Sequence, residues 1–247
     1  MIGIHHDNVI HLDHTASTND DAFAVLGQAS SCLVWTTDQR AGRGSRGREW
    51  LTPRDHGLAL SLGLHSEAVP SPGTWCYPLF AGVLLFDALA SLRPEASLSL
   101  KWPNDVLFEN RKLAGILCES RWSGSLPSIV LGMGVNLKHH QAMDDLPKSY
   151  AALSEWPEPP SPLQVVDAIK VHLGEVMSRY TDAEALNAAW LSRSALSPGQ
   201  GLRLHAMERD YTGTFVGLDA FGCLLLRDAT GTVHQIQQSC DDFQFLG

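Results

Sequence analysis

The sequence predicts an α+β fold in which a β-sheet flanked by helices is followed by a small all-β domain. Apolar runs with the length and composition of strands recur between residues 31 and 137. Segments with apolar residues at i, i+3 and i+4 lie between and after these runs and predict helices. Beyond Ser197-Pro198-Gly199 only short strand-like runs separated by glycines remain. We therefore place a domain boundary there, giving domains of residues 1–196 and 197–247.

Local signals place the individual elements. Ser17, Thr18 and Asn19 favour a helix N-terminus, and the acidic residues that follow suit its first turn. Pro94 ends the long apolar helix that begins near residue 75. The other expected elements are strands at 31–37, 57–65, 98–102, 112–120 and 128–137, helices covering 166–180 and 185–191, and C-terminal strands at 202–205, 212–218, 223–228 and 232–237.

The composition excludes several classes of protein. A chain of 247 residues with 44% hydrophobic and 18% charged residues can bury a substantial core, so long disorder is excluded. A formal net charge of −9 disfavours general nucleic-acid binding, which gains affinity from counterions released by basic side chains. The five cysteines form no CxxC pair, and no signal peptide or membrane-length apolar segment is present. We expect a cytoplasmic protein that does not enter a membrane.

The Arg/Gly loop, residues 39–50, concentrates positive charge in an acidic chain. Its arginines, with Arg54 just beyond, are Arg40, Arg43, Arg46 and Arg48. Its glycines satisfy the pattern GxGxxG, but no helix follows, so a dinucleotide fingerprint is disfavoured. Guanidinium groups on a glycine-rich loop suit phosphate or carboxylate ligands. The alternative for this loop alone is a solvated surface turn.

A second block, Lys101 to Gly115, places two lysines beside a turn. Lys101-Trp102-Pro103-Asn104-Asp105 closes a strand, and Lys112 opens the next one, so we predict a hairpin flanked by the two lysines. The Asp105 carboxylate could hold a hard cation such as magnesium, and Lys112 could neutralise an anion. For the tripeptide alone, an ordinary Pro-Asn-Asp turn is the alternative.

Together these motifs resemble the biotin protein ligases. The order and spacing of Ser-Thr-Asn, GRGSRGREW, KWPND, KLAGIL and GMGVN match that family from about Thr15 to Asn136. The resemblance implies a class II synthetase-like catalytic domain with a mixed sheet, and a C-terminal barrel of Src-homology-like type. It also implies that biotin and ATP form biotinyl-adenylate with magnesium, and that the biotinyl group passes to a lysine of biotin carboxyl carrier protein. Two alternatives stay open: a lipoate ligase or octanoyl transferase, and a non-catalytic biotin- or nucleotide-binding regulator.

The resemblance also implies roles for particular residues. It implies catalytic roles for Lys112, Asp105 and Arg46, with Asp105 as the magnesium ligand. Biotin-binding roles are implied for Ser17, Thr18, Asn19, Gln39, Arg43, Gly44, Ser45, Lys112 and Gly115. ATP-binding roles are implied for Arg46, Arg48, Trp50, Asn104 and Asn136.

Two departures from the family pattern lead to further expectations. Ser45 stands where the familiar GRGRxGR form of the loop has an arginine, so we expect faster escape of the adenylate unless Arg46 or Arg48 compensates. Ser17 lies too near the start for a helix-turn-helix domain to precede it, so we expect a short form without a DNA role. The acceptor carboxylase and the choice between monomer and homodimer are left open by the sequence.

Overall fold

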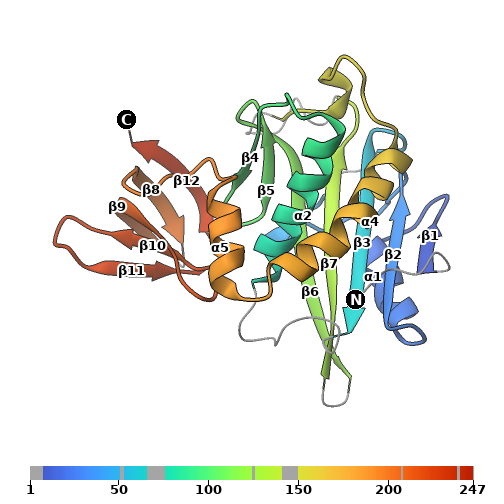
Figure 1. Ribbon diagram of the computed structural model, residues 1–247, viewed down its shortest axis with the longest axis horizontal. Helices are drawn as coiled ribbons and strands as arrows, with labels where there is room; N and C mark the ends of the chain where they lie inside the picture. The colour runs from blue at the N-terminus through green and yellow to red at the C-terminus, as the bar shows by residue number, and fades with distance from the viewer. Residues whose placement is uncertain are drawn as a thin grey trace.

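The computed structural model describes residues 8–50, 53–65, 76–123, 126–140, 150–206, 208–237 and 240–246. They form two sheets (Figure 1): a seven-stranded sheet of order β1-β2-β3-β7-β6-β5-β4, and a five-stranded sheet of order β11-β10-β9-β8-β12. The α+β class and the C-terminal all-β unit are thereby confirmed. The boundary at residue 196 stays a prediction, and it lies between the last helix and the first strand of the smaller sheet.

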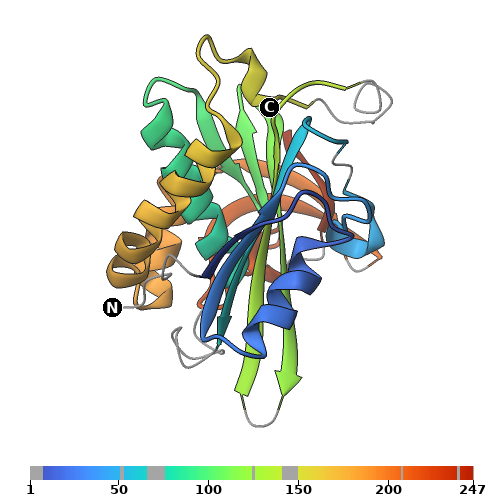
Figure 2. The same ribbon diagram turned by 90° about the vertical axis from the view of Figure 1, so that its right-hand side faces the viewer.

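The larger sheet is mixed because β1 pairs with β2 in parallel, while its other recorded pairs are antiparallel. Neighbouring strands β6 and β7 form a long hairpin that extends beyond the rest of the sheet (Figure 2). The strands of this sheet are β1 (Val9–His11), β2 (Ser31–Thr36), β3 (Gly57–His65), β4 (Leu98–Lys101), β5 (Asp105–Phe108), β6 (Arg111–Ser123) and β7 (Leu126–Asn136).

Helices cover both faces of the larger sheet (Figure 2). On one face α2 (Tyr77–Leu92) packs between the sheet and α4 (Pro162–Arg179), and it also contacts α5 (Ala183–Leu191). This position explains why α2 is apolar on nearly all sides. On the other face the short helix α1 (Thr18–Leu26) packs on β2, β3 and β7. No helix among the described residues is long and apolar enough to cross a membrane.

The predicted hairpin between Lys101 and Lys112 was wrong in one respect. Asp105 does not belong to a simple turn but begins β5, which pairs with β4 through Lys101↔Asp105 and with β6 through Asp105↔Gly115. A second turn follows at Glu109 and Asn110, both with positive φ. Four apolar-rich residues are too short a run to separate from a turn by periodicity, so β5 was missed.

The smaller sheet docks on the larger domain through the turn between β9 and β10. Trp102, which is buried, donates from Nε1 to the Gly222 carbonyl at 3.0 Å, and Asn187 donates from Nδ2 to the Asp219 carbonyl at 2.7 Å. Its strands are β8 (Gly201–Ala206), β9 (Arg209–Leu218), β10 (Leu224–Arg227), β11 (Val233–Ile236) and β12 (Cys240–Leu246). β12 was missed because two acidic residues interrupt its apolar pattern.

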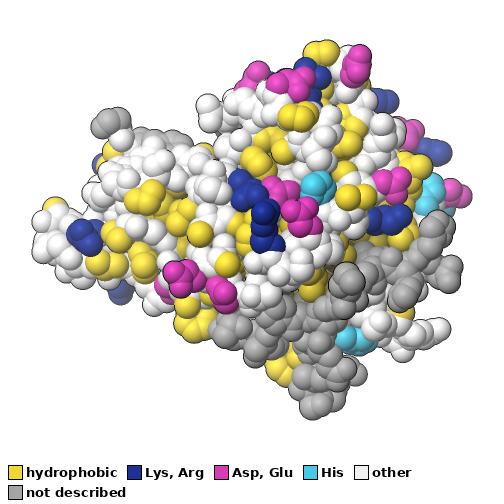
Figure 3. Space-filling model, viewed as in Figure 1, with side chains coloured by type: hydrophobic (Ala, Val, Ile, Leu, Met, Phe, Trp, Pro, Cys, Tyr) yellow, Lys and Arg dark blue, Asp and Glu magenta, His cyan; other side chains and the backbone are white. Residues whose placement is uncertain are grey.

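The face that carries α2, α4 and α5 mixes charges of both signs with hydrophobic side chains (Figure 3). No broad field of positive charge is visible among the described residues on this face.

Glu155 links the segment that begins at residue 150 to β6 through contacts with Arg111. Its carboxylate accepts hydrogen bonds from Arg111 Nη1 at 3.1 Å and from the Ala152 backbone N–H at 2.8 Å, and the His139 ring lies 2.8 Å away. Burial raises the pKa of Glu155, but the hydrogen bond from Arg111 leads the effects that lower it, and the result is a pKa of about 2. The folded state therefore favours the ionised carboxylate.

Glu155→Gln is expected to lower the melting temperature at pH 7 by several degrees. For a chain of this size, each kcal/mol lost from the free energy of unfolding lowers the melting temperature by about 2–4 °C. Because the folded-state pKa lies below the ordinary value of 4.5, the stabilisation is complete above that value and is lost as pH falls towards 2. Thermal unfolding followed from pH 7 to pH 2.5 should show the gap between variant and wild type closing. Glu175→Gln, at an exposed carboxylate on α4, is the control. A gap independent of pH would contradict this account.

Candidate active site

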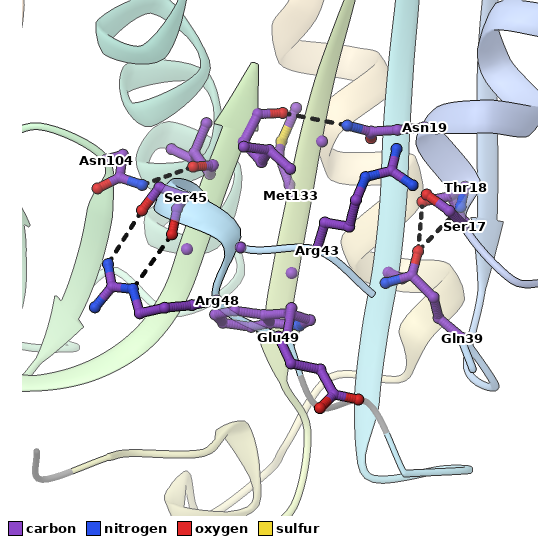
Figure 4. A pocket seen from close by; sticks show the side chains of 18 of the residues that line it. Ser17, Thr18, Asn19, Gln39, Arg43, Ser45, Arg48, Glu49, Asn104 and Met133 are labelled. Carbon is purple, nitrogen blue, oxygen red and sulfur yellow. Dashed lines mark hydrogen bonds between the residues drawn. The ribbon is translucent and has the colours of Figure 1, made fainter. Parts of the chain in front are cut away.

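A cavity of about 430 Å³ lies on the α1 face of the larger sheet (Figure 4). The N-terminus of α1 forms one end, the Arg/Gly loop lies over the middle, and residues of β6 and β7 form the floor. Thirteen of the fifteen residues predicted to form the site line this cavity. Of the other two, Asp105 lies beside a lining residue, and the side chain of Arg46 is outside the described part of the chain.

The polar end of the cavity is formed by Ser17, Thr18, Asn19 and Gln39. Ser17 is the N-cap of α1 but makes no capping hydrogen bond with its side chain, and the hydroxyl and backbone N–H of Thr18 both donate to Gln39 Oε1. Behind them, the fully buried Ser61 hydroxyl lies 2.7 Å from Thr18 Oγ1 and 2.6 Å from Asn19 Oδ1. Ser61 was missed, although a lone polar residue within the apolar strand β3 was an available signal.

Glycines on the floor of the cavity leave space for the side chains that lie over it. A Cβ atom at Gly132 would overlap the amide of Asn19, and one at Gly134 would overlap the Trp50 indole. A Cβ at Gly115 would lie 2.8 Å from Trp50. The indole therefore lies directly over β6 and β7. It can do so only because Gly115 on β6 and Gly134 on β7 have no side chain.

The Arg/Gly loop is held in a compact form by its own backbone. Trp50 N donates to Gly42 O at 2.9 Å, Gly44 N donates to Arg48 O at 2.7 Å, and a single 3₁₀ turn, η2 (Ser45–Gly47), lies between. Arg48 donates to Ser45 Oγ at 3.1 Å. Gly44, Ser45, Arg48 and Trp50 all line the cavity, so the loop presents both charge and an aromatic surface to it.

Arg43 lines the cavity but directs its guanidinium group to protein carboxylates. It donates to Asp20 on α1 at 2.8 Å and to Glu119 on β6 at 3.1 Å (Figure 4 shows its direction towards Asn19). The hydrogen bond that Arg43 donates to Asp20 is the largest of the effects that raise the pKa of Arg43, and the same hydrogen bond lowers the pKa of Asp20. In this arrangement the charge of Arg43 is balanced within the protein.

The lysine end of the cavity is formed by Lys112, Asn104 and Asn136. Lys112 Nζ lies 2.6 Å from Asp105 Oδ1 and 5.3 Å from the centre of the Trp50 ring, a cation–π distance. Asn104 donates from Nδ2 to the Ile116 carbonyl at 2.7 Å, and Asn136 donates to the carbonyls of Lys112 and Ala151. The amide donors of both asparagines thus hold backbone in place, and their predicted contact with ATP stays a prediction.

Tyr150 also lines the lysine end and was missed. Burial and the nearby Asp105 carboxylate raise the pKa of its phenol, while Arg48 lowers it. Its backbone forms a β-bridge with Lys112, which lies 38 residues earlier in the chain, so no local motif could have predicted its place in the site.

Together the two ends suit a ligand with a polar head, an apolar body and an anionic tail. The polar end offers hydrogen-bond donors and acceptors, the floor is apolar, and Lys112 and Arg48 supply positive charge. Asp105 keeps Lys112 in place, and both side chains are largely buried. A buried cation beside an open cavity can stabilise negative charge that develops on a bound substrate.

Comparison with known proteins agrees with this geometry. The model of the biotin/lipoate A/B protein ligase family matches residues 9–136, which span all fifteen predicted site residues. The chain belongs to this family. A biotin–acetyl-CoA-carboxylase ligase of Paracoccus denitrificans is 32% identical over 236 residues, covering 89% of this chain and 94% of that protein. The bifunctional ligase/repressor BirA of Bacillus subtilis is 26% identical over 240 residues, covering 91% and 70%.

Solved structures share the fold of this family member. A biotin protein ligase from Aquifex aeolicus in complex with biotin and ATP superposes with a TM-score of 0.79 and 23% identity, covering 97% of this chain and 99% of that one. A biotin protein ligase from Leishmania major in complex with biotin gives a TM-score of 0.67 and 22% identity over 93% of this chain and 98% of that chain. Both likenesses include the C-terminal sheet, because they cover nearly the whole chain.

Proposed function

We propose that this chain is an ATP-dependent biotin protein ligase that forms biotinyl-adenylate and transfers the biotinyl group to a lysine of biotin carboxyl carrier protein. The observation that carries the proposal is one cavity with a hydrogen-bonding end at Asn19 and Gln39 and a cationic end at Lys112. Biotin has a ureido head, an apolar bicycle and a carboxylate tail in that order, which matches the order of these surfaces. Relatives named as biotin ligases favour biotin over lipoate.

In the first step a biotin carboxylate oxygen attacks the α-phosphorus of ATP, and the bond to pyrophosphate breaks. Two anions must approach each other, so cations are needed where the charge develops. Lys112 is the proposed contact to the carboxylate and the α-phosphate, with Arg48 and Arg46 contributing from the loop. Trp50 and the loop backbone would exclude water from the mixed anhydride.

Magnesium is part of the proposal, with Asp105 as its protein ligand. Magnesium takes oxygen ligands and needs few from the protein when phosphates supply the rest. Asp105 fits this role because its largely buried carboxylate lies at the lysine end of the cavity, where the phosphates are proposed to bind, with Lys112 Nζ 2.6 Å from its Oδ1. Bound there, magnesium would neutralise phosphate charge. No group of three metal-binding side chains occurs among the described residues, so a site formed by the protein alone is not proposed.

In the second step the acceptor amine attacks the acyl carbon and AMP leaves, while the amine loses a proton. Asp105 is the proposed acceptor of that proton, since it is a carboxylate beside the lysine end of the cavity. The carrier protein, a cytoplasmic location and the absence of a DNA role are parts of this same proposal.

The test incubates the full chain with biotin, ATP, magnesium and a biotin carboxyl carrier domain, and measures the intact mass of the carrier. The expected result is one biotinyl increment that requires ATP. Parallel reactions replace biotin with lipoate or octanoate. An increment only with lipoate or octanoate would favour the related ligases, and binding of biotin without any increment would favour a non-catalytic regulator.

Ser45→Arg is expected to slow release of biotinyl-adenylate by roughly 5- to 150-fold, as for one added charge-assisted hydrogen bond of about 1–3 kcal/mol. The uncharged Ser45 hydroxyl accepts a hydrogen bond from Arg48, so the variant adds a cation to the loop. Release of labelled adenylate from a preformed complex measures the effect, with Ser45→Ala as the uncharged control. Equal release rates for Ser45→Arg and wild type would mean that Arg46 or Arg48 already supplies the missing charge.

A further inference from the structure

Glu119 on β6 joins two groups that come from different parts of the chain. Its Oε2 atom accepts a hydrogen bond from Asn19 Nδ2 at 2.7 Å and another from Arg43 at 3.1 Å. Asn19 belongs to the polar end of the cavity, and Arg43 belongs to the Arg/Gly loop. One carboxylate oxygen therefore connects the place where the ligand head would bind with the loop that lies over it.

The contacts of Asn19 leave its amide one orientation. A carboxylate can only accept hydrogen bonds, so the amide nitrogen must face Glu119. On the opposite side the Ser61 hydroxyl lies 2.6 Å from Asn19 Oδ1, and Gly132 gives the amide its space. The remaining amide hydrogen has only a long contact, 3.4 Å, to the Leu117 carbonyl. Glu119 is thus the strongest partner of the Asn19 donor.

Arg43 has a second anchor that does not involve Asn19. It contacts both carboxylate oxygens of Asp20, at 2.8 and 3.2 Å, and Arg121 also contacts Asp20. These side chains are partly exposed, and ion pairs of this kind usually contribute little stability. Asp20 therefore offers a matched comparison: it binds the same arginine, and among the described residues its hydrogen-bond partners do not include the Asn19 side chain.

We propose that Glu119 is a positioning residue that couples occupation of the polar end of the cavity to closure of the Arg/Gly loop. A ligand head that engages Asn19 strengthens the orientation that Glu119 sets, and the same carboxylate holds Arg43 and with it the first half of the loop. Linkage requires the effect to be reciprocal, so a closed loop also favours ligand binding at Asn19. This inference rests on the proposed function only in taking biotin as the ligand.

The test measures binding and loop exposure without measuring catalysis. Biotin affinity is determined by calorimetry, and loop exposure by the rate of trypsin cleavage after Arg43, Arg46 and Arg48, with and without biotin. The variants are Glu119→Ala, Glu119→Gln and Asp20→Asn, each first checked for its melting temperature. Glu119→Gln keeps an acceptor for Asn19 and a similar volume, so it stays informative if Glu119→Ala folds poorly.

For Asp20→Asn we expect faster cleavage without ligand, biotin affinity within twofold of wild type, and continued protection by biotin. For Glu119→Ala we expect about tenfold weaker biotin binding, as for loss of a hydrogen bond to a charged group, and loss of protection by biotin. Glu119→Gln should recover most of the affinity but little of the protection, because the charge that holds Arg43 is gone.

Two results would overturn the coupling. If Glu119→Ala or Glu119→Gln binds biotin and biotin still protects the loop as in wild type, Glu119 does not couple ligand binding at the polar end to closure of the Arg/Gly loop. If Glu119→Ala and Asp20→Asn behave alike, only the ion pair with Arg43 matters. Failure of the wild-type chain to bind biotin would overturn the proposed function, and the coupling with it.

Discussion

Lys112→Met is expected to slow adenylate formation by about 10²–10³-fold, the usual effect of removing one preorganised electrostatic contact. Lys112 contacts both the Asp105 carboxylate and the Trp50 ring, and its side chain is only 17% exposed. Its charge acts in surroundings that water screens poorly, so no exposed arginine can replace it fully. Single-turnover release of pyrophosphate from biotin and ATP measures the step directly.

Two controls separate chemistry from folding in this experiment. Lys138→Met removes an exposed lysine that follows β7 and should leave the rate unchanged. Lys112→Met leaves the Asp105 carboxylate buried without its ion-pair partner, which destabilises a fold. Lys112→Met/Asp105→Asn removes both charges and should recover stability but not the rate. Recovery of the rate in this double variant would mean that Lys112 acts only by neutralising Asp105.

Gly134→Ala is expected to lower kcat/KM for ATP by roughly 5- to 150-fold, the range that corresponds to an overpacking cost of about 1–3 kcal/mol. A methyl group on β7 at this position would overlap the Trp50 indole, so the indole must leave the floor. The Arg/Gly loop would then lose the contact that fixes its C-terminal end above Lys112. KM for biotin should change less, because the polar end lies beyond Gly132.

A double-mutant cycle decides whether Trp50 carries this effect. Trp50→Ala removes the overlapping ring, so Gly134→Ala should have little further effect in that background. Gly174→Ala on α4 is the matched control, since a Cβ there has nothing within 4 Å. If Gly134→Ala is equally damaging with and without Trp50, the glycine is required for the ligand itself rather than for the indole.

Much of the fold followed from local sequence signals. Strand β3 has the predicted bounds, and α1, α2, α4 and α5 occur where helices were expected. The missed strands, β1, β5 and β12, are short or interrupted by acidic residues, and each exists because a neighbouring strand supplies its hydrogen bonds. Pairing partners far along the chain decide such strands, and local periodicity does not report them.

The sequence by itself determined which residues gather at the cavity, because linear motifs carry their glycines, arginines and lysines at fixed spacing. Only the tertiary structure decided what each does there. Arg43 and Glu119 are 76 residues apart, and Asn19 and Glu119 are 100 apart, so no local pattern links them. Pairing of β6 with β7, on which α1 packs, brings the carboxylate to both groups. It thereby gives Arg43 two carboxylate partners away from the lysine end, where Lys112 is paired with Asp105.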